Sequence, residues 1–340
     1  MRERPGRRAP VLLLALVLVS GSGCGASGGQ PTSTATGPAP TASALAPSPS
    51  LSTPSTTTAP MSTPTPQPPQ TPQPTTTPEP TTTPEPKWEL AWSDEFNGPA
   101  GSLPDPETWT YELGDGTAAG NPGWGNQERE WYTADPANVS VDGKGRLQIT
   151  VRPSDGATTC WYGPCEYTSA RILTRDLRTF QYGRIEVRLH QPAGWGIWPA
   201  VWLLGTNIGE VGWPSCGEID VMEYMGRRPD EFLGTIHGPG YSGSSGKTAT
   251  LVPESSPAKG FHTYTVDWEP GALTWYYDGV QYHHVTREDV APNEWVFDAP
   301  FFMVLNVAMG GTLGGLIDPS IELPQSMTVD YVRVYRRVDQ

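Results

Sequence analysis

Hydrophobic and polar side chains alternate in short segments after residue 87, with Gly, Pro, Asn and Asp between the segments. Alternation with a period of two is typical of strands that bury one face, and no long segment has helical periodicity. Many short strands at close spacing predict an all-β sandwich or jelly roll. The clearest alternating segments are residues 146–151, 183–189, 263–268, 273–277 and 328–334.

Turn residues connect some of these segments. The sequence Glu-Pro-Gly-Ala at 269–272 lies between segments 263–268 and 273–277, which predicts a hairpin. Asp278 and Gly279 then predict a second turn, into residues 280–282.

The composition changes sharply near residue 87. All 13 Trp, 13 Tyr and 7 Phe lie at or after Trp88, so the preceding chain has no aromatic residue to build a core. Residues 25–87 are rich in Pro, Thr and Ser and include a near repeat of Thr-Thr-Thr-Pro-Glu-Pro. Such a segment has too little apolar surface to offset chain ordering, so we expect a disordered linker. Residues 88–340 are then expected to form one large all-β domain.

Residues 1–24 have the pattern of an export signal. Four Arg precede a nine-residue apolar run at 11–19, which is too short to span a bilayer but suits a signal peptide. The following Ser-Gly-Ser-Gly-Cys, ending at Cys24, resembles a bacterial lipoprotein processing site. We expect either a lipoprotein at the cell surface, tethered to the membrane through a lipidated Cys24, or a secreted extracellular protein.

Three carboxylates interrupt the apolar, strand-like stretch at 218–224. Glu218 and Asp220 point to one face of a strand, and Glu223 joins them only if a β-bulge adds a residue at Val221 or Met222. Two carboxyls about 5 to 5.5 Å apart are what a retaining glycosidase needs. A calcium site or a structural acidic cluster is the alternative interpretation.

The chain resembles glycoside hydrolase family 16, in particular its bacterial laminarinase-like members, which cut β-1,3-glucans. The family pattern Glu-x-Asp-x-x-Glu is matched by Glu218, Asp220 and Glu223. One departure is Thr312-Leu313-Gly314, where members often carry a Trp for sugar stacking. Further matching motifs lie at 94–98, 123–128, 167–172, 198–202, 212–217, 235–241, 295–298, 306–311 and 329–335.

The resemblance implies a fold and a mechanism. The fold is a β-jelly roll of two curved antiparallel sheets with an open cleft on the concave face. Glu218 is the implied nucleophile and Glu223 the acid/base of a retaining, endo-acting hydrolysis of β-1,3-glucan, with Asp220 orienting Glu218. A hydrolase for mixed-linkage β-1,3-1,4-glucan or algal galactan is the alternative within this fold. A non-catalytic carbohydrate-binding jelly roll is a further alternative, although it has no use for paired acids.

Four Trp residues just before this strand and His237 after it are candidates for sugar binding. The resemblance implies that Asn126 and Arg171 also contact sugar. Core packing is the alternative for at least one Trp, a buried ion pair for Arg171, and a structural role for His237. The candidates are Asn126, Arg171, Trp195, Trp198, Trp202, Trp213 and His237.

The net charge of the chain limits the classes of molecule that it can bind. With 36 acidic and 22 basic residues, the net charge is −14, which disfavours nucleic acid and is compatible with a neutral glucan. We expect a monomer.

Cleavage by two carboxylates requires no metal, but the resemblance implies a possible structural calcium ion, for which Glu95 and Asp330 are the candidate ligands.

Cysteine usage agrees with export. Cys160 and Cys165 flank Trp-Tyr-Gly-Pro, which suits the tight turn of a small disulfide loop. Cys216 is left without a partner and is expected to be a buried free thiol.

Overall fold

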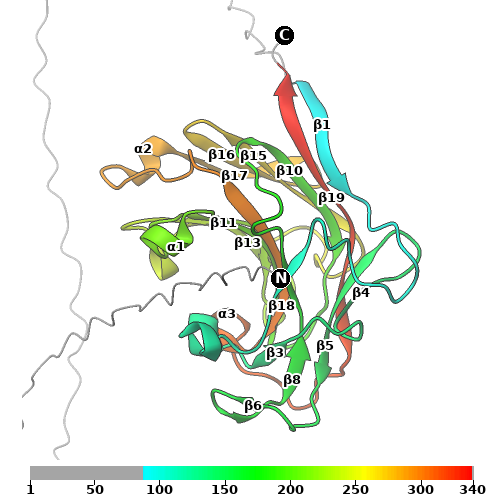
Figure 1. The fold of residues 1–340 in the computed structure, drawn as a ribbon. Coiled ribbons are helices and arrows are strands. Elements are labelled where there is room, and N and C mark those ends of the chain that lie inside the picture. Colours follow the sequence, from blue (N-terminus) through cyan, green and yellow to red (C-terminus); the bar gives the residue numbers. More distant parts are fainter. Residues whose placement is uncertain (1–86, 339–340) are drawn as a thin grey trace, which may run out of the picture. The chain divides into compact units, whose positions relative to one another are not determined.

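Two curved, mostly antiparallel sheets make up residues 87–338, the part of the chain that this computed structural model describes (Figure 1). The predicted all-β sandwich is confirmed. The predicted signal peptide, Cys24 and all but the last residue of the linker lie outside the described residues.

The first sheet has ten strands, in the order β17-β16-β15-β10-β19-β5-β8-β3, with β1 beside β19 and β4 beside β5. All of its pairs are antiparallel except β3 with β8. Its strands are β1 (Lys87–Asp94), β3 (Glu130–Tyr132), β4 (Val139–Val141), β5 (Leu147–Pro153), β8 (Tyr167–Ser169), β10 (Gly183–His190), β15 (His262–Glu269), β16 (Ala272–Tyr277), β17 (Val280–Thr286) and β19 (Gln325–Val338).

The second sheet has seven strands, in the order β14-β13-β12-β11-β18-β9-β2. Its strands are β2 (Thr110–Glu112), β9 (Arg171–Leu173), β11 (Ile197–Gly205), β12 (Glu218–Tyr224), β13 (Phe232–His237), β14 (Lys247–Leu251) and β18 (Phe301–Met309). A separate two-stranded hairpin is formed by β6 (Thr159–Cys160) and β7 (Gly163–Pro164).

The helices are short. Each has three or four residues: η1 (Thr117–Ala119), η2 (Pro122–Gly125), α1 (Ile208–Val211), η3 (Gly243–Ser245), α2 (Arg287–Val290) and α3 (Gly311–Gly314). Among the described residues, none has the length and apolar character needed to cross a membrane.

The alternation seen in the sequence places the core between the sheets. In β10, Ile185, Val187 and Leu189 are fully buried, while the intervening charged residues are only partly buried. The predicted hairpin of β15 with β16 and the turn into β17 are both present. One continuous apolar cluster takes side chains from both sheets, so the hydrophobic effect holds the sandwich together.

The first and last described strands are neighbours. β1 pairs antiparallel with β19, and Lys87 lies opposite Val338 (Figure 1). The register shifts between Leu90 and Trp92, which marks a bulge in this edge pair.

Candidate active site

Strand β12 contains the predicted β-bulge. Against β11, Met222 pairs with Val201 and Asp220 with Trp202, which leaves Val221 as the extra residue. Against β13, the register likewise shifts by one residue between Asp220 and Glu223. A bulge puts two residues opposite one, so the alternation is reset and Glu223 returns to the face of Glu218.

The bulge sorts the side chains of β12 between two environments. Ile219, Val221 and Met222 belong to the core between the sheets. The carboxylates of Glu218, Asp220 and Glu223 therefore lie on the opposite side of the seven-stranded sheet, which we call the open face. Asp220 is buried there at 2% exposure, whereas Glu218 and Glu223 are partly exposed.

Each carboxylate has a nitrogen-bearing ring beside it. Trp213 donates its indole N–H to Glu218 Oε2 at 2.6 Å, and Trp198 donates to Glu223 Oε1 at 3.2 Å. His237 Nε2 lies 3.3 Å from Asp220 Oδ2. His237 therefore contacts Asp220, the middle carboxylate of the three.

Burial raises the pKa of all three carboxyls. It raises the pKa of Glu218 to about 8, with added repulsion from Asp220, while His237 and the Trp213 N–H act in the opposite direction. It also raises the pKa of Asp220 to about 8, although the hydrogen bond with Glu218 opposes this shift. The pKa of Glu223 is well above its usual range because of burial and repulsion from Asp220 and Glu218.

These shifts give the carboxyls different chemistry. Glu223 is kept protonated and can donate a proton to a departing oxygen. The hydrogen bond with Glu218 favours the ionised form of Asp220, so Asp220 accepts it. The indole N–H of Trp213 and the positive charge of Arg171 favour the ionised form of Glu218. Glu218 thus has groups that stabilise its ionised form, as a nucleophile requires, while Glu223 is repelled by both other carboxylates and is poised as an acid.

The four candidate Trp residues have different surroundings. Trp195 and Trp213 are about half exposed, at 53% and 49%. Trp198 is buried against Glu223, and Trp202 donates to Asn306 Oδ1 at 2.8 Å. Trp202 also packs against a small apolar cluster that includes Leu204, Phe302 and Val304, which fits the core-packing alternative for one of the four.

Arg171 is held in a buried ion pair, the alternative that the sequence had left open. Its guanidinium binds Glu128 at 2.8 Å and Glu112 at 3.2 Å, and only 5% of the residue is exposed. The rings of Trp124 and Tyr132 flank it, with centroids 4.5 and 4.6 Å from Cζ. The positive charge nevertheless favours ionisation of Glu218 and so lowers its pKa.

A second buried acidic group lies behind this arginine and was not singled out in the sequence. Glu130 is fully buried, and its Oε2 accepts the N–H of Met309 at 2.6 Å. Burial and the neighbouring Glu128 raise the pKa of Glu130 well above its usual range, so Glu130 stays protonated at neutral pH. The signal available in the sequence was the closeness of two acids, Glu128 and Glu130, to the candidate Asn126.

Asn126 belongs to the same network. Its side-chain amide donates to Glu128 Oε1 at 3.2 Å. Tyr132 donates to Glu128 Oε2 at 3.0 Å and accepts from Asn306 at 3.0 Å. The residues expected to contact sugar are thus oriented by buried hydrogen bonds from β3 and β18.

The two candidate calcium ligands are both bound to arginines. Glu95 makes a two-pronged ion pair with Arg333, at 2.8 and 2.9 Å, and Asp330 binds Arg188 at 2.5 Å. Across residues 87–338, no group of three or more His, Cys, Asp or Glu side chains is arranged to hold a metal ion. The side chains described here therefore give the calcium hypothesis no support.

The predictions for Cys160, Cys165 and Cys216 are confirmed. Cys160 and Cys165 form a disulfide, with their Cα atoms 5.0 Å apart. Cys216 is a buried free thiol, and burial together with the nearby Glu218 raises its pKa to about 11. It is thus protonated at neutral pH and is not a nucleophile.

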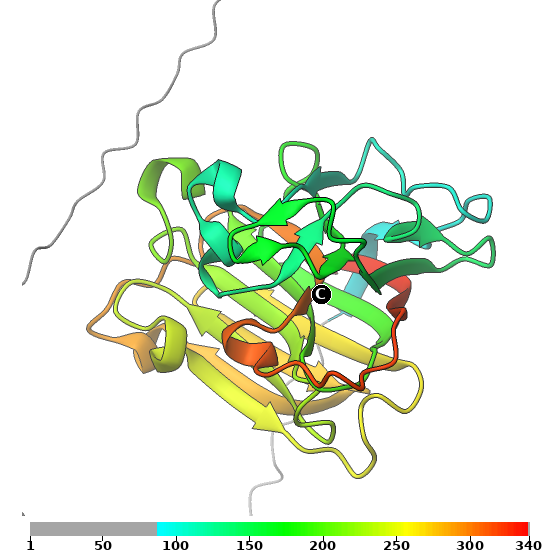
Figure 2. The same cartoon turned by 90° about the horizontal axis from the view of Figure 1, so that it is seen from below.

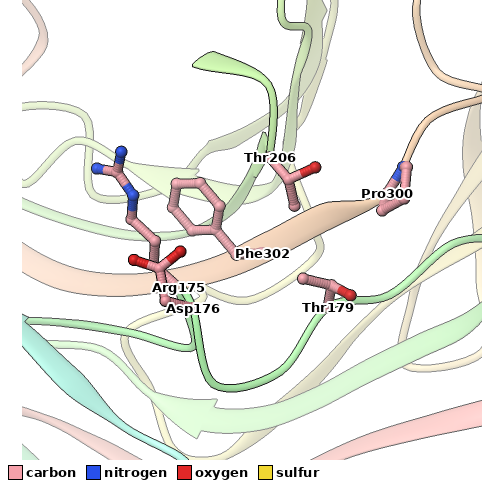
Figure 3. A pocket seen from close by; sticks show the side chains of 6 residues that line it. All are labelled: Arg175, Asp176, Thr179, Thr206, Pro300 and Phe302. Atoms are coloured by element: carbon pink, nitrogen blue, oxygen red, sulfur yellow. The ribbon is translucent and has the colours of Figure 1, made fainter. Parts of the chain in front are cut away.

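A cavity of about 220 Å³ lies away from the carboxylates (Figure 3). It is located where β9 and β11 end and β18 begins, and none of the acids of β12 lines it. The lining residues are Arg175, Asp176, Thr179, Thr206, Pro300 and Phe302.

Comparison with known proteins identifies the family of this chain. Residues 126–333 match the family described as glycosyl hydrolases family 16. A protein named Beta-glucanase from Rhodothermus marinus is 39% identical over 266 residues, which are 74% of this chain and 86% of the relative.

Solved structures agree in fold. An endo-β-1,3-glucanase from Pyrococcus furiosus has 45% identity and a TM-score of 0.71, over 75% of this chain and 97% of that one. The catalytic domain of a laminarinase from Thermotoga petrophila has 44% identity and a TM-score of 0.70, over 75% of this chain and 100% of that one. With the family match, these likenesses show that the chain belongs to glycosyl hydrolase family 16 and has its jelly-roll fold.

Proposed function

We propose that the protein hydrolyses β-1,3-glucan internally and with retention of anomeric configuration. The observation that carries this proposal is the bulged strand β12. It gathers Glu218, Asp220 and Glu223 on one face and gives each outer carboxylate an indole N–H. Relatives named endo-β-1,3-glucanase or laminarinase support the choice of substrate.

The first step forms a bond between enzyme and sugar. Glu218 Oε attacks the anomeric carbon, the bond from that carbon to the glycosidic oxygen breaks, and Glu223 gives its proton to the departing oxygen. The indole N–H of Trp213 holds Glu218 by a hydrogen bond while the negative charge of Glu218 is consumed.

The second step releases the sugar. Once Glu218 is esterified, its charge no longer opposes ionisation of Glu223, so the pKa of Glu223 falls and the residue can act as a base. Glu223 then takes a proton from water, and the oxygen of that water attacks the anomeric carbon and frees Glu218.

The test is to replace Glu218 by Gly and add azide. We expect turnover of an activated aryl β-glucan substrate to fall by at least about a thousandfold, which is about four kcal/mol of barrier. Azide fits the vacated space and should restore turnover, giving the α-glycosyl azide. A Glu218→Gly variant that retains normal turnover, or an azide product of β configuration, would show that Glu218 is not the nucleophile.

Product sizes decide between the substrates. Incubation of residues 87–340 with laminarin, lichenan, agarose and cellulose should give short oligosaccharides from laminarin first. Preferred cleavage of lichenan or agarose would instead favour the mixed-linkage or galactan alternative. Monomeric sugar as the first product would contradict endo action.

We further propose that the protein is exported and acts as a monomer outside the cytoplasm. The basic and apolar segments before Cys24 support export, as does the Cys160–Cys165 disulfide, since disulfides persist in oxidising compartments. Under the lipoprotein hypothesis, Cys24→Ser should move the protein from the membrane fraction to the medium. If the wild-type protein is already in the medium, plain secretion is correct.

A further inference from the structure

The loop that carries Asn126 has a strained backbone. Two of its non-glycine residues, Trp124 and Gln127, have left-handed φ values of 53° and 61°. Such conformations persist only where the surrounding contacts hold them. We call residues 115–128 the site loop; it includes η1 and η2.

The site loop lies against candidate sugar-binding residues at two points. The Trp124 ring lies on the Arg171 guanidinium, and its centroid is 5.9 Å from that of Tyr132. The carbonyl of Asn126 accepts the N–H of Thr312 at 2.8 Å, next to Gly311, which packs on the Trp198 ring. A shift of this loop therefore moves groups that lie beside the candidate sugar contacts.

The loop closed by Cys160 and Cys165 holds the site loop near both ends. We call residues 160–165 the disulfide loop. The backbone N–H of Trp161 donates to Asp115 Oδ2 at 2.6 Å, and its indole N–H donates to the carbonyl of Glu128 at 2.7 Å. Asp115 is itself buried, and its carbonyl accepts the N–H of Gly123 at 2.8 Å.

Close packing adds to these hydrogen bonds. A Cβ atom on Gly123 would lie 2.9 Å from the Trp161 indole nitrogen, so the ring lies directly on the site loop. Tyr162 donates to the carbonyl of Arg129 at 2.6 Å, and the Arg129 guanidinium lies 4.0 Å from the Tyr162 ring centroid. Figure 2 shows the hairpin of β6 and β7 beside the site loop.

The hairpin is too small to keep this geometry unaided. β6 and β7 have two residues each and form a sheet of their own. A hairpin with so few backbone hydrogen bonds is marginal in water, so the covalent cross-link limits where Trp161 can go.

We propose that the disulfide loop is a positioning element for glucan binding, in which the Cys160–Cys165 bond keeps Trp161 against the site loop and thereby fixes Trp124 and Asn126. This inference rests on the proposed β-1,3-glucanase function. Glu218 and Glu223 lie on β12, outside both loops. Loss of the disulfide should therefore weaken substrate binding and leave cleavage of the glycosidic bond in place.

Laminarin kinetics test the proposal in wild type, Cys160→Ala/Cys165→Ala and Trp161→Phe. Trp161→Phe keeps an aromatic ring but removes the indole N–H that binds the Glu128 carbonyl. It therefore tests the hydrogen bond between the two loops and not ring stacking. We expect KM to rise about tenfold in the double variant and severalfold in Trp161→Phe, with kcat within about twofold of wild type. Reducing the wild-type enzyme should reproduce the effect, and reoxidation should reverse it. Reductant should have no further effect on the double variant, whose remaining thiol in the described domain is Cys216.

Hydrogen exchange supplies a readout that needs no activity. Backbone amides of 116–128 should exchange faster in the reduced enzyme, while those of β12 keep their protection. Unchanged KM and unchanged exchange on reduction would overturn the proposal, as would a fall in kcat at constant KM. If the enzyme does not cleave laminarin at all, the proposed function fails. The exchange experiment still decides whether the disulfide loop holds the site loop in place.

Discussion

Trp275 on β16 donates its indole N–H across the sandwich to the backbone carbonyl of Asp220, at 2.9 Å. The bulge interrupts the ladder between β12 and β13 at this residue, so the carbonyl needs another donor. Gly234 lies opposite the bulge, and a Cβ atom there would be 2.7 Å from the Trp275 ring. The opposite sheet thus supplies the hydrogen bond that lets the catalytic strand bulge.

Trp275→Phe should reduce both stability and turnover. Leaving the buried carbonyl of Asp220 without a donor costs about 1 to 3 kcal/mol, and a relaxed bulge misplaces the carboxylates beside it. Melting temperature and kcat on laminarin measure the two effects. Trp268→Phe is a matched control, because Trp268 is equally buried and donates to the Phe297 carbonyl at 2.9 Å, away from β12. Equal losses of kcat in both variants would contradict a specific role for Trp275.

Asp220→Asn should shift the pH–activity profile to lower pH. The charge of Asp220 raises the pKa of both Glu218 and Glu223, so its removal lowers both. The acid limb of kcat/KM reports ionisation of Glu218 and the alkaline limb reports loss of the Glu223 proton, so both limbs should move the same way. Glu89→Gln is the control. Glu89 forms an exposed ion pair with Arg336 within the ten-stranded sheet, so its loss should move neither limb.

Glu218→Gln should stabilise the protein at alkaline pH. The pKa of Glu218 is about 8 in the folded protein and near 4 in an unfolded chain, so the folded state holds the extra proton between these values. Stability therefore falls as pH rises through this window, by up to ~1.4 kcal/mol per pH unit for this group. The partial exposure of Glu218 reduces that slope.

The measurement is the difference in melting temperature between Glu218→Gln and wild type at pH 5, 6.5 and 8. The difference should grow with pH, to several degrees. Glu254→Gln changes an exposed carboxylate in the same way and should show no such growth. A constant difference across the three pH values would mean that the pKa of Glu218 is not raised.

Two changes at Met222 test the bulge. Deleting Met222 restores regular alternation, so the strand should fold with its acids on one face, but with reduced activity because neighbouring strands fit the bulge. Met222→Ala keeps the bulge but empties a fully buried position, which costs about 2 to 5 kcal/mol of stability. A fully active deletion beside an inactive Met222→Ala would refute this account of the site.

The sequence predicted features that depend on neighbouring residues. Glu223 is out of phase with Glu218, so the bulge followed from strand periodicity, and the disulfide followed from the short turn between Cys160 and Cys165. The buried pairing of Arg171 with Glu128 was visible only as an alternative, because it joins two residues 43 positions apart that only the fold brings together. The bond from Trp275 to Asp220 spans 55 residues and two sheets, and no local pattern signals it.

The pairing of β1 with β19 has a consequence for engineering. Since Lys87 and Val338 lie opposite each other in one ladder, the two ends of the described domain leave it at the same place. A short linker could therefore join them, and new ends could be opened at an exposed turn such as Asp278–Gly279, in a circular permutant that keeps every strand neighbour. For the same reason, the domain could be inserted into a surface loop of a host protein, because the two ends of that loop could stay close together.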